Sequence, residues 1–138
     1  MTVNFADLSE GDTLPPLEFG PVSRHVLALY CGGSGDHNPI HVDIDFARAS
    51  GVDDVFAHGM FSMGVLARML TQWVPQEQIR EFGVRFTALT PVHATITCKG
   101  KVVEKLTIDG EQCVRLKLAT ALDDGTVTLA GSATVALS

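Results

Sequence analysis

Hydrophobic positions in the first half of the chain recur at helical spacing, in short stretches that glycines interrupt. Ser23 can cap a helix over residues 24–30, and the glycine pair at 32–33 is expected to end it. Asp43 can cap a further turn of helix over residues 44–49, which the next glycine would close. The first half therefore predicts short helices joined by irregular segments.

The most unusual segment covers residues 59–70, which are apolar nearly all round. No solvent-facing stripe can be drawn on a helix of this sequence, and a helix of that kind is buried on most sides. At a rise of about 1.5 Å per residue it reaches only about 18 Å, which suits a core helix and is too short for a membrane span. We expect this helix at the centre of the fold.

After Pro75 the periodicity changes from helix to strand. β-Branched and alternating residues predict four strands, over residues 82–86, 96–103, 114–118 and 127–137. Turn signals separate them at Thr90-Pro91, Asp109-Gly110 and Asp123-Asp124-Gly125. Short turns between consecutive strands imply an antiparallel sheet. The order of elements predicts an α+β fold, in which one domain over residues 1–138 wraps a curved sheet around the apolar helix.

Composition and length exclude several classes of protein. Apolar residues make up 46% and charged residues 19%, which fits a globular chain. The net charge of −6 argues against nucleic-acid binding. No stretch is long enough to span a membrane, and the N-terminus lacks the pattern of a secretory signal. The cysteines (Cys31, Cys98 and Cys113) are odd in number and widely spaced, so we expect reduced thiols in a cytoplasmic protein.

The residues best suited to chemistry lie in the irregular stretch before the apolar helix. Asp36 and His41 are five residues apart, a spacing that separates their side chains in a helix or a strand. They converge only if the chain bends, and Asn38-Pro39 supplies a bend. An Asp and a His can then hold one water, which the carboxylate orients while the imidazole accepts or returns a proton. The alternative is that Asp36 and Asn38 only cap turns and that His37 and His41 lie on the surface.

A second candidate lies where the apolar helix should begin, at His58 and Gly59. The first N–H groups of a helix lack internal partners, and a glycine lets a ligand oxygen come close to them. Such an N–H can stabilise negative charge that develops on a thioester carbonyl oxygen. Ser62 shares a helix face with Gly59 and can touch the same ligand. The alternative is that Gly59 serves close packing and that Ser62 bonds back to its own helix.

Other constellations fit less well. Metal ligands can be imagined at His37, His41, Asp43 and His58, but their spacing matches no helical H-x-x-x-H site. The sequence contains no G-x-S-x-G elbow, phosphate loop or dinucleotide-binding glycine pattern. The methionines of the apolar helix are expected in the core rather than at a cofactor.

Two motifs at these positions resemble the signature of MaoC-like dehydratases and (R)-specific enoyl-thioester hydratases. They are residues 35–41 (GDHNPIH) and residues 58–60 (HGM). The likeness extends to the acidic run after His41, to the apolar helix, and to residues 84–88 (VRFTA). Overall the chain is similar to the single-domain (3R)-hydroxyacyl dehydratase subunits of bacteria.

The resemblance implies a hotdog fold, in which an antiparallel sheet wraps around a central helix. It also implies a dimer, a homodimer or a heterodimer with a paralogous subunit, whose sheets join edge to edge. The expected substrates are acyl thioesters of coenzyme A (CoA) or acyl carrier protein in fatty-acid metabolism. They would be interconverted between the trans-2-enoyl and (3R)-3-hydroxyacyl forms. Neither a metal nor a redox cofactor is expected.

Carried over by position, Asp36 and His41 would hold the catalytic water, and the backbone N–H of Gly59 would bind the thioester carbonyl. Further contacts with the substrate would come from Asn38, Ser62 and His58. One stretch departs from the family pattern, since relatives place a Pro-Gly-Asp turn where residues 91–95 read PVHAT. This departure concerns a local loop and leaves the catalytic pair untouched.

Two other roles remain open, a thioesterase that uses the same thioester pocket and a non-catalytic subunit. A thioesterase would send water to the carbonyl carbon of the thioester, but a His held beside an Asp suits attack at the double bond better. A non-catalytic subunit that only stabilises a partner would not need Asp36 and His41.

Overall fold

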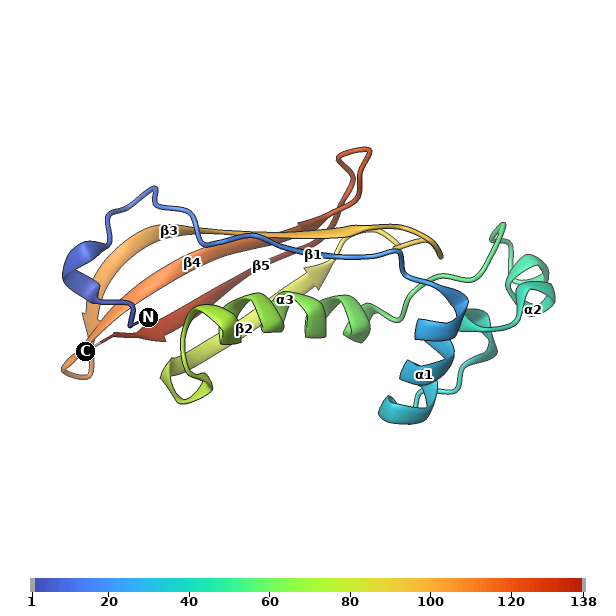
Figure 1. Ribbon diagram of the computed structural model, residues 1–138, viewed down its shortest axis with the longest axis horizontal. Helices are drawn as coiled ribbons and strands as arrows, with labels where there is room; N and C mark the ends of the chain where they lie inside the picture. The colour runs from blue at the N-terminus through green and yellow to red at the C-terminus, as the bar shows by residue number, and fades with distance from the viewer. Residues whose placement is uncertain (1, 138) are drawn as a thin grey trace.

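The computed structural model describes residues 2–137, which form a curved five-stranded sheet with a long helix along one side (Figure 1). The strands lie in the order β1-β3-β4-β5-β2, and all neighbours are antiparallel. They are β1 (Leu17–Phe19), β2 (Ile79–Phe86), β3 (Ile96–Ile108), β4 (Glu111–Ala121) and β5 (Val127–Ala136). The helices are α1 (Arg24–Ser34), α2 (Ile44–Ala49) and α3 (Gly59–Trp73), with short 3₁₀ turns η1 (Phe5–Asp7), η2 (Pro39–His41) and η3 (Gln76–Gln78). The predicted α+β arrangement is confirmed.

All four predicted strands are present, and the hairpin turns lie where their residues place them. Asp109 and Gly110 connect β3 to β4 with positive φ angles of 50° and 82°, as a type I′ turn requires. Gly125, at φ 86°, turns the chain between β4 and β5. Strand β1 was not predicted, because three residues carry no alternation to recognise; it pairs with β3, with Leu17 opposite Cys98.

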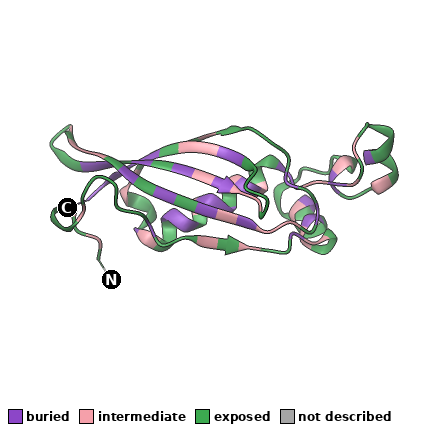
Figure 2. Ribbon diagram, turned by 90° about the horizontal axis from the view of Figure 1, so that it is seen from above, coloured by how far each residue is buried: buried purple, intermediate pink, exposed green. Residues whose placement is uncertain are grey.

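Helix α3 packs one face against the sheet and leaves the other open (Figure 2). Leu66 and Leu70 are fully buried in the core, whereas Met60, Gly64 and Arg68 on the opposite side are exposed. Most residues of 59–70 are buried or partly buried, as predicted, but the helix has a solvent-facing stripe where none was expected. A single sheet covers only one face of a helix, so an outer stripe that includes Met60 and Arg68 remains uncovered.

Helix α1 begins where predicted and ends later. Ser23 Oγ accepts a hydrogen bond of 3.1 Å from the Val26 N–H, which makes it the N-cap. The helix continues through the glycine pair at 32–33 and ends at Ser34, because Gly35 is the residue that adopts the left-handed conformation, at φ 78°. The predicted stop at residues 32–33 was wrong, since glycine permits a left-handed φ but does not impose it.

Residues 35–58 form an excursion beyond one end of the sheet, next to the N-terminus of α3 (Figure 1). Helix α2 lies in this excursion as predicted, with Asp43 accepting from the N–H groups of Asp45 and Phe46. All three cysteines are buried and free. Within residues 2–137 no helix is long and apolar enough to cross a membrane.

Candidate active site

The loop before η2 is shaped by its own side chains, each accepting a hydrogen bond from the backbone two residues further on. Ser34 Oγ accepts from the Asp36 N–H at 3.1 Å, and Asp36 Oδ1 accepts from the Asn38 N–H at 3.2 Å. Asn38 Oδ1 accepts from the Ile40 N–H at 3.1 Å, which caps the 3₁₀ turn that ends at His41. The chain therefore bends at Asn38-Pro39, as the sequence predicted.

This bend brings the two candidate catalytic side chains together. Asp36 Oδ2 lies 4.0 Å from His41 Nε2, and the Asp36 side chain is 53% exposed while that of His41 is 9% exposed. A separation of 4.0 Å is too long for a direct hydrogen bond. One water with bonds of about 2.8 Å to each atom fits between them. The two side chains are therefore close enough to share one water, as the predicted role requires.

The imidazole of His41 has a fixed tautomer. Its Nδ1 lies 2.7 Å from the carbonyl oxygen of Phe56. Because a carbonyl only accepts, Nδ1 carries the hydrogen and donates it. In the neutral ring the lone pair is then on Nε2, the atom that faces Asp36. His41 is therefore oriented to take a proton from a water held at Asp36.

His58 lies behind this pair rather than on the wall of a pocket. Its side chain is buried, with the residue only 2% exposed, and its Nε2 donates to the main-chain carbonyl of Asp36 at 3.2 Å. Its ring stacks on that of His41, with centroids 3.8 Å apart and planes 24° from parallel. The Cys31 thiol lies 3.5 Å from the same Nε2. His58 thus contacts both members of the pair and holds them in place, a position unlike the substrate contact that the resemblance implied.

Burial of His58 makes the stability of the fold depend on pH. Burial is the largest cause that lowers the pKa of this imidazole, and its hydrogen bond to the Asp36 carbonyl opposes part of the shift. As the pH falls below about 6.5, the unfolded state therefore binds more protons than the folded state, and stability declines. We expect the melting temperature to fall from about pH 7.5 to about pH 5.5 less steeply in His58→Gln than in the wild type. The exposed His37→Gln should keep the wild-type slope, and an unchanged slope in His58→Gln would contradict the assignment.

The N-terminus of α3 supplies free backbone donors. Its N-cap residue, His58, makes no side-chain capping bond, so no capping side chain occupies the N–H groups of Gly59 and Met60. A Cβ at Gly59 would lie 2.8 Å from two ring atoms of Phe86, so only glycine leaves this approach open without moving the ring. Ser62 is buried on the same face, with its Oγ 3.5 Å from Thr90 Oγ1. Gly59 and Ser62, which were predicted to act together, therefore line the same pocket of about 120 Å³.

Three residues could be considered as metal ligands. One ligand atom each of Asp36, His41 and His58 lies within 4.8 Å of the others. The two imidazole rings are stacked, however, so an ion in the plane of one ring lies well outside the plane of the other. The His58 Nε2 hydrogen is also given to the Asp36 carbonyl. We assign no metal to this cluster, because joining all three ligands would require the His58 ring to reorient and to give up its bond to the Asp36 carbonyl.

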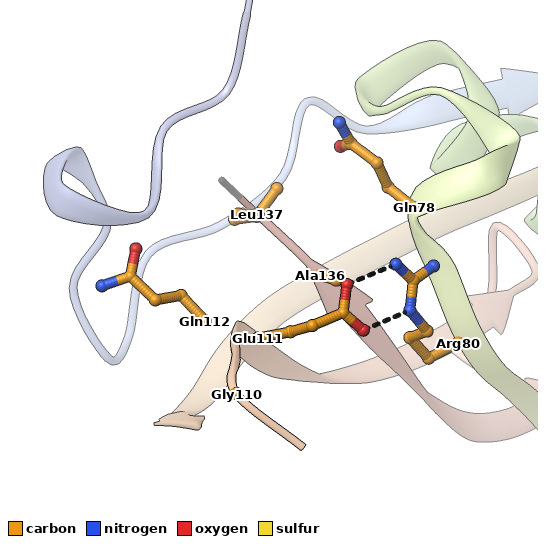
Figure 3. Close-up of a pocket in the computed structure, with 7 residues that line it drawn as sticks. All are labelled: Gln78, Arg80, Gly110, Glu111, Gln112, Ala136 and Leu137. Carbon is orange, nitrogen blue, oxygen red and sulfur yellow. Dashed lines mark hydrogen bonds and ion pairs between the residues drawn. The ribbon is translucent and has the colours of Figure 1, made fainter. Parts of the chain in front are cut away.

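A larger hollow of about 470 Å³ lies near the β3–β4 turn, at the end of the sheet away from α1 and α2 (Figures 1 and 3). Its charged residues satisfy each other: Arg80 donates to both carboxylate oxygens of Glu111, at 2.8 and 2.7 Å. The guanidinium lowers the pKa of Glu111. With its charges paired in this way, the hollow offers no group suited to acid–base chemistry.

Taken together, the sheet wrapped around a helix and the acid–imidazole pair beside that helix define the class: a hotdog-type domain with a site for acid–base chemistry. The family model described as "MaoC like domain" matches residues 14–122, and the chain belongs to this family.

Relatives with curated names share much of the chain. The (R)-specific enoyl-CoA hydratase of Rhodospirillum rubrum is 31% identical over 107 residues, which cover 73% of each protein. The 3-hydroxyacyl-thioester dehydratase Z of Mycobacterium tuberculosis is 27% identical over 106 residues, which cover 71% of this chain and 70% of that protein.

Solved structures establish the hotdog fold. The R-hydratase PhaJ1 from Pseudomonas aeruginosa matches with a TM-score of 0.85 at 23% identity, over 99% of this chain and 86% of that one. A chain of the ChsH1–ChsH2 complex from Mycobacterium tuberculosis matches with a TM-score of 0.79 at 21% identity, over 94% of this chain and 98% of that one.

Sequence reasoning missed three contributors to the site. Phe56, through its carbonyl, fixes the tautomer of His41, and Phe86 and Thr90 line the pocket beside Gly59. Thr90 had been noted only as part of a turn signal. Each lies 15 or more residues from the site residue that it serves, so periodicity carried no signal for these contacts, and Phe86 had been noted only within the family-like residues 84–88.

Proposed function

We propose that the protein is an (R)-specific hydratase/dehydratase that interconverts trans-2-enoyl and (3R)-3-hydroxyacyl thioesters. The observation that carries the proposal is the 4.0 Å separation between Asp36 Oδ2 and His41 Nε2, with the tautomer of His41 fixed by the Phe56 carbonyl. The named relatives support the choice, since one is an enoyl-CoA hydratase and another a 3-hydroxyacyl-thioester dehydratase.

The reaction uses groups that the site already holds. In the hydration direction, His41 Nε2 takes a proton from the water that Asp36 orients, while the water oxygen bonds to the β-carbon of the enoyl group. The electron pair of the double bond moves toward the thioester carbonyl, whose oxygen becomes negative and accepts from the Gly59 N–H. The imidazolium returns a proton to the α-carbon, which gives the 3-hydroxyacyl thioester. Dehydration is the reverse.

We propose that the working unit is a dimer. Strand β2 is at one edge of the sheet, so its outer side is unpaired within residues 2–137. An unpaired edge is a template for another strand, so this edge is where a partner would join the sheet. The partner is a second copy of this chain or a paralogous subunit. The match to a chain of a two-protein complex is compatible with the second arrangement.

The acyl carrier is coenzyme A or acyl carrier protein. The reduced state of the three buried cysteines fits a cytoplasmic enzyme.

The competing activities differ in the bond that water attacks. A thioesterase would release a free thiol, whereas a hydratase removes the conjugated double bond and leaves the thioester intact.

The purified protein, mixed with trans-2-hexenoyl-CoA, should bleach the ultraviolet absorbance of the conjugated enoyl thioester without releasing thiol. Chiral analysis of the product should give the (R)-3-hydroxyacyl form. Thiol release at the rate of bleaching would favour the thioesterase. Absence of bleaching in the isolated protein, with activity restored by a co-purifying paralogue, would favour the non-catalytic subunit.

A further inference from the structure

The pocket beside the N-terminus of α3 is small, at about 120 Å³. Phe86 and Leu89 stand at its rim and are more than half exposed, at 56% and 53%, while Leu129 is 2% exposed and forms its inner wall. Its walls are mostly apolar, and none of the described residues that line it carries a formal charge. It therefore suits an uncharged group that ends inside the protein.

Two buried hydroxyls on the wall of this pocket lack good partners. Ser62 is 2% exposed and Thr90 is 4% exposed. Their oxygens are 3.5 Å apart, beyond the usual range of about 2.5 to 3.0 Å for a hydrogen bond between hydroxyls. Within residues 2–137 this long contact is the only hydrogen bond that either side-chain oxygen makes. Both hydroxyls thus keep hydrogen-bonding capacity directed at the pocket.

Elsewhere the same protein satisfies such a pair. The buried hydroxyls of Thr120 and Thr128 are 2.7 Å apart, and Thr128 Oγ1 is also 3.3 Å from the Thr120 carbonyl. Buried polar groups without partners are unfavourable, and proteins contain few of them. The loose pair at Ser62 and Thr90 is therefore best explained by a ligand atom that bonds to both oxygens.

The volume of the pocket limits the size of that ligand group. An apolar cavity of about 150 Å³ takes up benzene, which has six carbons. A pocket of about 120 Å³ therefore holds about four or five non-hydrogen atoms. The arm of an acyl carrier must continue to solvent and cannot end here, whereas the end of an acyl chain can.

We propose that the pocket receives the end of the acyl group, and that Ser62 and Thr90 select short acyl groups that carry a neutral hydrogen-bonding atom, such as a hydroxyl or keto oxygen. The inference rests on the proposed function, since it takes the thioester carbonyl to lie at the Gly59 N–H, which borders the same pocket. A carboxylate is disfavoured, because no described cation lines the wall to pair with it.

The test compares trans-2-hexenoyl-CoA with its 6-hydroxy derivative, which places four non-hydrogen atoms beyond the β-carbon. The wild type should show a kcat/KM about tenfold higher for the hydroxylated substrate, the effect expected of one or two new hydrogen bonds. The near-isosteric Thr90→Val and Ser62→Ala should each reduce this ratio toward one. Thr128→Val, which removes a hydroxyl from the satisfied pair, should keep the ratio.

Calorimetric binding of hexanoyl-CoA and 6-hydroxyhexanoyl-CoA separates this inference from the proposed function, because it requires no turnover. Turnover of hexenoyl-CoA with equal kcat/KM and equal Kd for the two acyl groups overturns the inference and leaves the proposed function standing. No turnover, with a tenfold difference in Kd that Thr90→Val removes, supports the pocket assignment and overturns only the proposed function. If the variants lose the same binding affinity for both acyl groups, the two hydroxyls contact the carrier arm instead, which overturns the inference. If the wild type binds neither ligand, both the inference and the proposed function are overturned.

Discussion

Asp36→Asn and His41→Gln are each expected to lower kcat for hydration by about 10²- to 10⁴-fold, the usual contribution of a positioned acid or base. Asn at position 36 still offers an oxygen to the Asn38 N–H, so the turn survives while the negative charge that orients the water is lost. Gln at position 41 has no nitrogen that takes up a proton near neutral pH. Enoyl-CoA bleaching measures the loss, and circular dichroism checks that the fold is retained.

His37→Gln is the matched control for these two variants. His37 lies in the same loop, between the two proposed catalytic residues, and its side chain is exposed. Its replacement should leave kcat within a few-fold of the wild type. The double variant of Asp36 and His41 should lose little more than either single variant, because two groups acting on one water fail together. Full activity in both single variants would remove the pair from the mechanism.

Gly59→Ala should reduce kcat/KM by about 10- to 10²-fold, because small displacements at a reacting centre are costly. Alanine suits the helical backbone, but its Cβ would meet two ring atoms of Phe86 at 2.8 Å. Either the ring moves into the mouth of the pocket or the thioester carbonyl is held away from the helix N-terminus. Adding Phe86→Ala to this variant should restore part of the activity, which steady-state kinetics can measure.

Gly64→Ala is the control within the same helix. A Cβ at this position meets nothing within 4 Å. Alanine is the better helix former by up to about 1 kcal/mol, so the variant should unfold at a higher denaturant concentration with unchanged activity. If Gly59→Ala is as active as Gly64→Ala, the thioester carbonyl does not approach this end of α3.

The convergence of Asp36 and His41 was predictable because its causes are local. The bend at Asn38-Pro39 and the three side-chain-to-backbone bonds all lie within residues 34–40. The fold class was predictable for a similar reason, since the strands and their turns alternate regularly along the second half of the chain. The loop bonds and the β3–β4 and β4–β5 hairpins connect residues close in sequence, whereas the pairings of β1 with β3 and of β2 with β5 do not.

The supporting contacts were not predictable, because they join distant segments. The hydrogen bond from His58 to the Asp36 carbonyl spans 22 residues, and the contact between Ser62 and Thr90 spans 28. The motif assigned His58 to the substrate, whereas its burial and its stacking on His41 assign it to the scaffold. The exposed side of α3 was likewise not predicted, because methionine and glycine on that side count as apolar in a sequence pattern although they lie in solvent here.

The hydrogen bonds that shape the loop at Asp36 lie within residues 34–40, apart from β2 and the loop that follows it. His41 is held by Phe56 and His58, while Phe86, Leu89 and Thr90, from β2 and the loop after it, line the adjoining pocket. Substitutions at those three positions can therefore change which acyl group is accepted without rebuilding the machinery that adds water. A scaffold divided in this way can diversify its substrates while keeping a single reaction.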